Sequence, residues 1–186
     1  MISVVLALAV LVNVANGRGG EKMPNPSLML SAPFQDQTPG NWRPATETEL
    51  KSVIPARAPV GNERIETEFR TASGITNGKG QYVAGVVLIT AGYSADGKYS
   101  HFLLVQVPVR IGDIRLKPGS YVFGWRREAD SLRVMFYEAQ TGKFLGEVKA
   151  ERNSRIGKIE SFHLYAPKDK SLVQIGRFGF AYKIDG

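Results

Sequence analysis

The feature that most constrains this chain is a two-residue alternation of apolar and polar side chains that recurs throughout residues 62–186. In ERIETEFRTAS, Ile65, Thr67 and Phe69 alternate with charged residues, which predicts a half-exposed strand. QYVAGVVLITAGY is apolar on both faces and therefore predicts a central strand that is covered on both sides. The turn sequences NGKG, ADGK and QTGK separate such runs, and no helical pattern lies between them.

Eight predicted strands at nearly regular spacing indicate an all-β domain over residues 62–186. We expect a single antiparallel β-sandwich, and a closed eight-stranded barrel is the alternative. An internal cavity would distinguish the two architectures, because eight strands can enclose one small ligand.

The N-terminal segment has the pattern of a cleavable leader. Residues 1–17 carry no charged side chain, and their apolar run is shorter than the ~20 residues that a bilayer-spanning helix needs. Ala15 and Gly17 precede Arg18 as small residues precede a signal-peptide cleavage site. We therefore expect an exported bacterial protein, periplasmic or extracellular, with no transmembrane span once residues 1–17 are removed. The absence of cysteine excludes disulfides, which suits bacterial export better than a small secreted eukaryotic domain.

Residues 18–61 are rich in proline and glycine, which predicts an extended arm before the β domain. Trp42 and other apolar residues in this arm indicate that parts of it dock onto the domain. One short helix is expected near residues 46–54, where Thr46 and Glu49 have the spacing of a capping box. The predicted organisation is a leader, an arm with one helix, and a single β domain.

The chain is basic, with a net charge of +7, and most of the excess lies in the C-terminal half. From Arg110 onwards the chain holds 15 Lys and Arg against 9 Asp and Glu. Such an excess favours an anionic surface or an anionic glycan as the partner. The basic residues are spread over several strands and among acids, so the sequence does not predict a specific nucleic-acid groove.

Residues suited to catalysis are scarce. With no cysteine, thiol nucleophiles and thiolate metal sites are excluded, and the two histidines, His101 and His163, alternate with apolar neighbours. GITNGKG lacks the Ser or Thr with which a phosphate-binding loop holds magnesium, and no GxSxG motif occurs. Glu66 and Glu68 share one strand face with flanking arginines, as on a solvated surface. The sequence therefore predicts no catalytic residue, metal or cofactor and favours a protein that is not an enzyme.

RLKPGSYVFGWRRE places three aromatic residues, Tyr121, Phe123 and Trp125, at every second position of one predicted strand. As a platform, the rings would stack on sugar rings while Arg126 and Arg127 contact an anionic group. As a core wall, the rings would bury apolar area against the opposite half of the domain. We expect the core role for the row and a ligand-binding role at its end, where Trp125, Arg126 and Arg127 lie at the rim.

IRLKPGSYVFGW resembles a turn of exported β-sandwich modules of the transthyretin-like and carboxypeptidase-regulatory type. In those modules a hydrophobic residue, Pro-Gly and an aromatic residue introduce a core strand; the matching residues are Leu116, Pro118, Gly119 and Tyr121. FYEAQTGKFLGEV is similar to the matching hairpin, and the whole chain resembles uncharacterised exported bacterial proteins. The resemblance implies an exported β-sandwich and carries over no activity.

The sequence supports three functions in a definite order. The first is an exported, non-enzymatic β-sandwich module for binding or for interaction with the cell envelope. The second is a small barrel that binds an apolar ligand. The third is a hydrolase with an unrecognised site, in which His101 and His163 would converge with a carboxylate.

Overall fold

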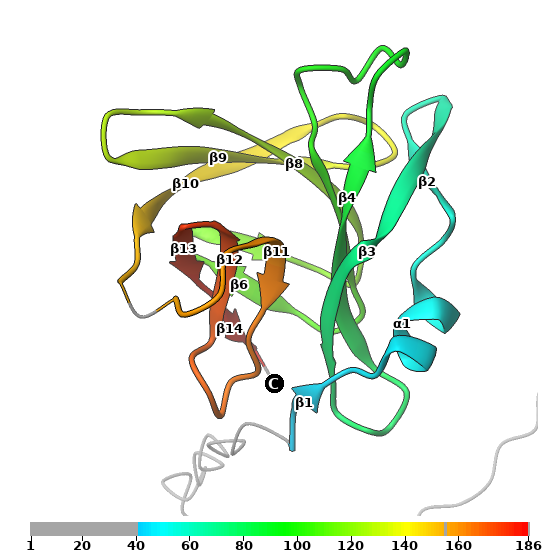
Figure 1. The fold of residues 1–186 in the computed structure, drawn as a ribbon. Coiled ribbons are helices and arrows are strands. Elements are labelled where there is room, and N and C mark those ends of the chain that lie inside the picture. The colour runs from blue at the N-terminus through cyan, green and yellow to red at the C-terminus, as the bar shows by residue number, and fades with distance from the viewer. Residues whose placement is uncertain (1–40, 155, 186) are drawn as a thin grey trace, which may run out of the picture. The chain divides into compact units, whose positions relative to one another are not determined.

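The computed structural model describes residues 41–154 and 156–185, which belong to one compact unit, Gln37–Gly186 (Figure 1). The predicted signal peptide, residues 1–17, and residues 18–40 of the arm lie outside the described residues. The described part consists of strands and one short helix, so the prediction of an all-β fold with one helix is confirmed.

Most strands belong to one antiparallel sheet of eleven strands. They are β1 (Arg43–Pro44), β2 (Arg57–Val60), β3 (Glu63–Thr76), β4 (Tyr82–Ile89), β5 (His101–Val105), β8 (Gly119–Arg127), β9 (Ser131–Glu138), β10 (Phe144–Arg152), β11 (Glu160–Leu164), β12 (Leu172–Gly176) and β13 (Phe178–Ala181). The order along the sheet is β1-β3-β4-β5-β8-β9-β10-β13-β12-β11, and β2 also pairs with β3. A second sheet has three strands in the order β14-β6-β7, formed by β14 (Lys183–Ile184), β6 (Val109–Ile111) and β7 (Ile114–Leu116).

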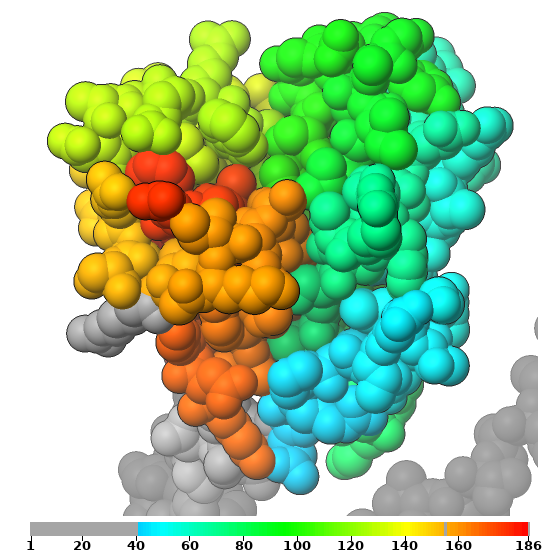
Figure 2. All heavy atoms as spheres, in the orientation of Figure 1, coloured from blue at the N-terminus to red at the C-terminus, as the bar shows by residue number. Residues whose placement is uncertain are grey.

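The large sheet curls until its two ends approach each other. The backbone N–H of Leu164 on β11 donates to the Ser73 hydroxyl oxygen on β3 at 3.0 Å. These two segments lie side by side on the surface (Figure 2). The sheet is therefore nearly closed: its halves face each other as in a sandwich, and its ends come together almost as in the barrel alternative.

Aromatic rings fill the space between the facing halves. The ring centroid of Phe123 lies 5.2 Å from that of Phe136 and 6.2 Å from that of Phe162. Phe136 in turn lies 5.8 Å from Phe180, nearly edge to face. These contacts join β8, β9, β11 and β13 into one core.

The aromatic row on β8 runs from this core to the solvent. Tyr121 is 8% exposed and Phe123 is 1% exposed, so the predicted core role is confirmed for both residues. Trp125 is 43% exposed, at the rim as predicted. The Tyr121 hydroxyl donates to the Lys117 carbonyl oxygen at 2.6 Å, which makes a tyrosine corner and fixes the turn that precedes β8.

A second apolar cluster covers the other face of β3, β4, β5 and β8. The helix α1 (Glu47–Val53) and β2 pack on this face, and Leu50 and Ile54 are buried there. The loop between β4 and β5 covers the same face, where a Cβ on Gly124 would lie 2.1 Å from the Lys98 carbonyl oxygen. Only glycine permits so close an approach of the two backbones.

Residues 41–61 of the predicted arm pack onto the β domain. Trp42 is 5% exposed, and β1 and β2 both pair with β3. The helix predicted near residues 46–54 is confirmed as α1. Its capping box is complete: the Thr46 hydroxyl accepts from the Glu49 N–H at 3.3 Å, and the Glu49 carboxylate accepts from the Thr46 N–H at 2.8 Å.

The C-terminal run SLVQIGRFGFAYKI, which the alternation predicts as one strand, is divided into β12, β13 and β14. Gly176 has a φ of +60°, which opens a tight turn that a residue with a Cβ adopts only under strain. β12 and β13 therefore form a hairpin, in which Val173 lies opposite Phe180. The prediction of a single strand was wrong because a two-residue turn leaves the alternation of buried and exposed residues nearly unchanged.

Candidate anion-binding site

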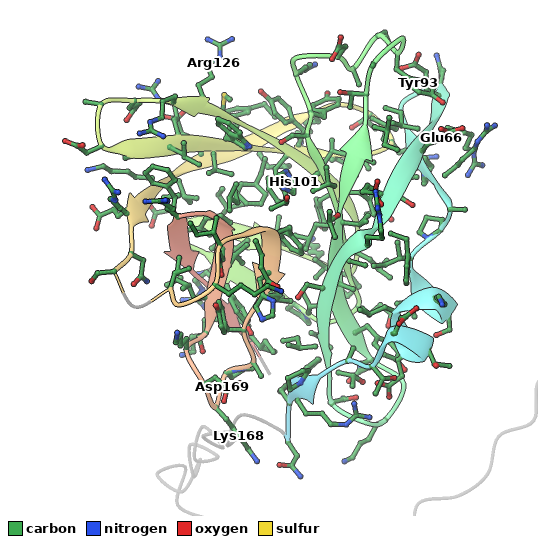
Figure 3. The ribbon with its side chains drawn as sticks, in the orientation of Figure 1. Glu66, Tyr93, His101, Arg126, Lys168 and Asp169 are labelled. Carbon is green, nitrogen blue, oxygen red and sulfur yellow. The ribbon has the colours of Figure 1, made fainter. Side chains whose placement is uncertain are left out.

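The candidate site lies at the end of the β8–β9 hairpin, which carries the predicted rim residues Trp125, Arg126 and Arg127. Trp125 and Arg127 leave the same face of β8 as Phe123, because side chains alternate along a strand. Arg126 leaves the opposite face and points away from the sheet (Figure 3). The structure therefore brings Trp125 and Arg127 together and separates Arg126 from them.

Arg126 belongs to a row of three cations on the outer face of the hairpin. It lies directly opposite Arg133 on β9, which lies opposite Lys149 on β10. The Glu128 carboxylate is 2.8 Å from the Arg133 guanidinium, and this hydrogen bond lowers the pKa of Glu128. Lys149 forms an ion pair with Glu151 at 3.5 Å. Because carboxylates offset two of its three charges, the row resembles a solvated charged face more than a binding site.

Arg127 lies near a different group of residues, on the inner face of the large sheet. Its guanidinium carbon lies 4.8 Å from the centroid of the Phe178 ring, within the range of a cation–π contact. Phe178 on β13 lies directly opposite Arg152 on β10, so their side chains leave the same face of the sheet. Arg177 precedes Phe178 in the turn after β12. We name Trp125, Arg127, Arg152, Arg177 and Phe178 the arginine rim.

The arginine rim borders an open cleft of about 500 Å³. Arg152 and Arg177 line this cleft together with Asn153 and Ile159. The backbone N–H of Asn153 donates to the Arg177 carbonyl oxygen at 3.1 Å, which ties the segment after β10 to the β12–β13 turn. Ile159 is 54% exposed, so the cleft offers an apolar surface beside two guanidinium groups.

Carboxylates do not neutralise the rim arginines. Within residues 41–154 and 156–185, no Asp or Glu oxygen lies within 4.0 Å of a side-chain nitrogen of Arg127, Arg152 or Arg177. The Arg127 Nε–H donates to the Glu128 carbonyl oxygen at 3.2 Å, and its other N–H donors have no acceptor among the described residues. The rim therefore holds three positive charges of the excess after Arg110 without compensation by a described carboxylate.

Sequence reasoning missed Arg152 and Arg177. They lie 25 and 50 positions after Arg127, and only the pairing of β10 with β13 brings them beside it. The single sequence signal for them is the charge excess of the C-terminal half, which names no residue. The opposite orientation of Arg126, in contrast, follows from the alternation along the strand and could have been predicted.

The two histidines do not converge. His101 is 3% exposed and lies in the interior, where its ring centroid is 5.6 Å from that of Phe162 on β11 (Figure 3). His163 follows Phe162 and leaves the opposite face of β11, where its Nδ1 is 2.8 Å from the Glu160 carboxylate. Burial lowers the pKa of His101 to about 4, so its ring is neutral at pH 7. The geometry that the hydrolase hypothesis requires of these two residues is not present.

The other groups with a chemical signature pair on the surface. Glu66 and Glu68 form ion pairs with Arg57 and Arg70 at 2.8 and 3.0 Å, as expected of a solvated strand face. The described part of the chain contains no group of three or more His, Cys, Asp or Glu side chains that could hold a metal ion. Nor does any helix within residues 41–154 and 156–185 have the length and apolarity to cross a membrane.

No protein-family model, curated protein or solved structure matches the chain. The fold and the site therefore define it by geometry alone, as a nearly closed all-β protein with an exposed cluster of arginines.

Proposed function

We propose that the chain is an exported, non-enzymatic binding module that holds an anionic glycan at the arginine rim. The observation that carries this proposal is a group of three arginines that have no carboxylate partner among the described residues. Arg127 leaves the same face of β8 as the exposed Trp125, and Arg152 and Arg177 line one cleft nearby. Guanidinium groups bind sulfate, phosphate and carboxylate oxygens through paired N–H donors. The Trp125 ring offers a flat apolar face to a sugar, about 7 Å along β8 from Arg127.

A glycan fits the rim better than a nucleic acid does. Proteins that hold single-stranded nucleic acid stack successive bases on several aromatic rings along a positively charged groove. At the rim only Trp125 is both aromatic and largely exposed, because Phe178 is 8% exposed and lies beneath Arg127. One stacking ring flanked by arginines favours recognition of a sugar that carries anionic groups.

A surface site is also favoured over an enclosed apolar ligand. The rings of Phe123, Phe136 and Phe162 occupy the interior between the sheet halves and contact one another there. An internal ligand would have to displace these side chains and lose their packing. The open cleft beside Arg152 and Arg177 needs no such rearrangement.

The proposal is tested with heparin as an anionic glycan probe and isothermal titration calorimetry. Arg127→Ala, Arg152→Ala and Arg177→Ala should each weaken binding about tenfold, because each removes charge-assisted hydrogen bonds worth ~1.5 kcal/mol. Arg126→Ala is the matched control, since it removes the same charge one residue away on the opposite face, and its Kd should stay within about twofold of the parent.

Two results would count against the proposal. Equal heparin affinity for the parent and all three rim variants would remove the arginine rim as the binding site. Tighter binding of a DNA oligonucleotide than of heparin, lost in the same rim variants, would replace the glycan by a nucleic acid. The Trp125→Ala variant should also bind heparin more weakly, and an unchanged affinity would remove the stacking role.

A further inference from the structure

The three-stranded sheet carries a second set of cations that the sequence does not reveal. Lys183 on β14 lies directly opposite Arg110 on β6, and Arg110 lies directly opposite Arg115 on β7. Residues that face each other in neighbouring antiparallel strands project from the same side of the sheet. The three side chains are exposed and form one straight line across the sheet, which we name the basic row.

Buried apolar residues support the strands that carry the basic row. Val109, Ile111, Ile114 and Leu116 leave the other face of β6 and β7 and are buried in the main core. The row is thus fixed by the backbone ladder and by the packing beneath it. Unlike residues on a loop, these three residues have Cα atoms at a constant spacing of about 5 Å per strand.

The charge of the basic row is largely uncompensated. Arg110 forms an ion pair with Asp185 at 2.9 Å. Within residues 41–154 and 156–185, neither Arg115 nor Lys183 has a carboxylate oxygen at ion-pair distance. Like charges directly opposite each other on neighbouring strands destabilise a sheet. A bound polyanion would remove this repulsion.

We propose that the basic row is a second contact for the anionic glycan, so that the partner is a polymer long enough to reach both the rim and the row. This inference rests on the proposed function for the chemistry of the partner. The two sites belong to one stretch of chain: Phe178 of the rim and Lys183 of the row are five residues apart, about 16 Å in extended backbone. Lys183 points away from the core and Phe178 into it, so the polymer would pass around the edge of the small sheet.

The linear arrangement favours an extended polymer over a membrane surface. A chain of sugars presents anionic groups one after another along a line, at a spacing on the scale of one sugar unit. An anionic bilayer presents charge over an area, and each basic residue near it contributes independently of its alignment. Three cations in strict register across three strands suit the first partner.

The experiment compares long heparin chains with a heparin tetrasaccharide in calorimetric titrations of the full chain. The row variant Arg115→Ser/Lys183→Ser removes the two uncompensated charges and leaves the Arg110–Asp185 pair in place. The control variant Arg57→Ser/Arg70→Ser removes two exposed arginines that are paired with glutamates elsewhere. Both variants therefore lower the net charge by the same amount.

The length of the heparin should distinguish the contributions of the two sites. Long heparin should bind the row variant about tenfold more weakly than the control variant, because a second contact adds avidity. The slope of log Kd against log salt concentration should fall by about two for the same reason, one for each lost contact. The tetrasaccharide, which covers the rim alone, should bind both variants equally. The melting temperature of the row variant should not fall, since like-charge repulsion is relieved.

Other outcomes overturn the inference and are distinguishable from a failure of the proposed function. If long heparin binds the row and control variants equally while rim variants lose affinity, the rim stands and the row is not a contact. If rim variants bind normally, the proposed function fails whatever the row does. If the row variant loses binding to anionic phosphatidylglycerol vesicles but not to long heparin, the row faces a membrane and the polymer inference is wrong.

Discussion

The imidazole of His101 and the ring of Phe123 stack in parallel, with centroids 4.6 Å apart and planes 6° from each other. The two residues face each other on β5 and β8. The Ser100 hydroxyl is 2.8 Å from the His101 Nδ1, and the His101 Nε2 is 3.5 Å from the Ser161 carbonyl oxygen. A neutral ring that accepts at Nδ1 and donates from Nε2 satisfies both contacts. This stacked pair joins the middle of the sheet to β11.

Replacing Phe123 by alanine should destabilise the protein strongly. Phe123 is 1% exposed and contacts three other rings, so its removal leaves a cavity that costs ~3–5 kcal/mol. Trp125→Ala should cost less, because Trp125 is 43% exposed. Thermal melts measure both effects. A melting temperature for Phe123→Ala within a degree or two of the parent would refute the core role of the row.

Stability should fall as the pH drops from 6.5 towards 4. The buried His101 has a folded pKa of about 4, below the ordinary value of 6.5, so folding favours its neutral form. The neutral His101 contributes fully to the free energy of unfolding above pH 6.5. This contribution is lost progressively as the pH falls to the folded pKa, by at most about 3 kcal/mol. Chemical denaturation at pH 7 and pH 5 measures the loss. His101→Phe should flatten this dependence; a dependence that stays unchanged in His101→Phe would mean that other groups cause it.

Gly124→Ala should destabilise the protein through a backbone clash. Its new methyl group would lie 2.1 Å from the Lys98 carbonyl oxygen, so the β4–β5 loop must move away from the sheet, at a cost of ~1–3 kcal/mol. Gly157→Ala is the matched control, because no atom lies within 4 Å of the position of its Cβ. Equal urea midpoints for the two variants would show that the loop yields without cost.

A chain that begins at Asn62 should fold poorly compared with one that begins at Gln37. The shorter chain lacks β1, α1 and β2, which bury Ile65 and Val86 on the outer face of the sheet. Exposure of this face should abolish a cooperative melt and cause aggregation. Calorimetric scans of both chains test this expectation. A cooperative transition of the shorter chain within a few degrees of the longer one would place the boundary of the stable domain at Asn62.

Export remains a prediction that depends on residues 1–17. Expression of the full-length chain in a bacterial host should yield a product in the periplasm or the medium that begins at or near Arg18. N-terminal sequencing identifies the first residue. A soluble cytoplasmic product that retains Met1 would contradict export, and the proposed glycan partner would then have to be sought inside the cell.

Much of the local structure could be predicted from the sequence. The alternation along RLKPGSYVFGWRRE predicted that Tyr121 and Phe123 are buried and that Trp125 lies at the rim. The spacing of Thr46 and Glu49 predicted the start of the only described helix. These predictions succeeded because each depends on residues a few positions apart, whose geometry is fixed by the strand or helix that contains them.

The sequence by itself determined the all-β class, the buried row on β8 and the capped helix, since periodicity and capping act over a few residues. The tertiary structure alone decided that Arg127, Arg152 and Arg177 share one rim, and that Lys183, Arg110 and Arg115 stand in one row. Those groupings depend on which strands are neighbours, and alternation carries no information about pairing partners far along the chain. Strand pairing is selected by the packing of the whole core, so the sites it creates become visible only in the fold.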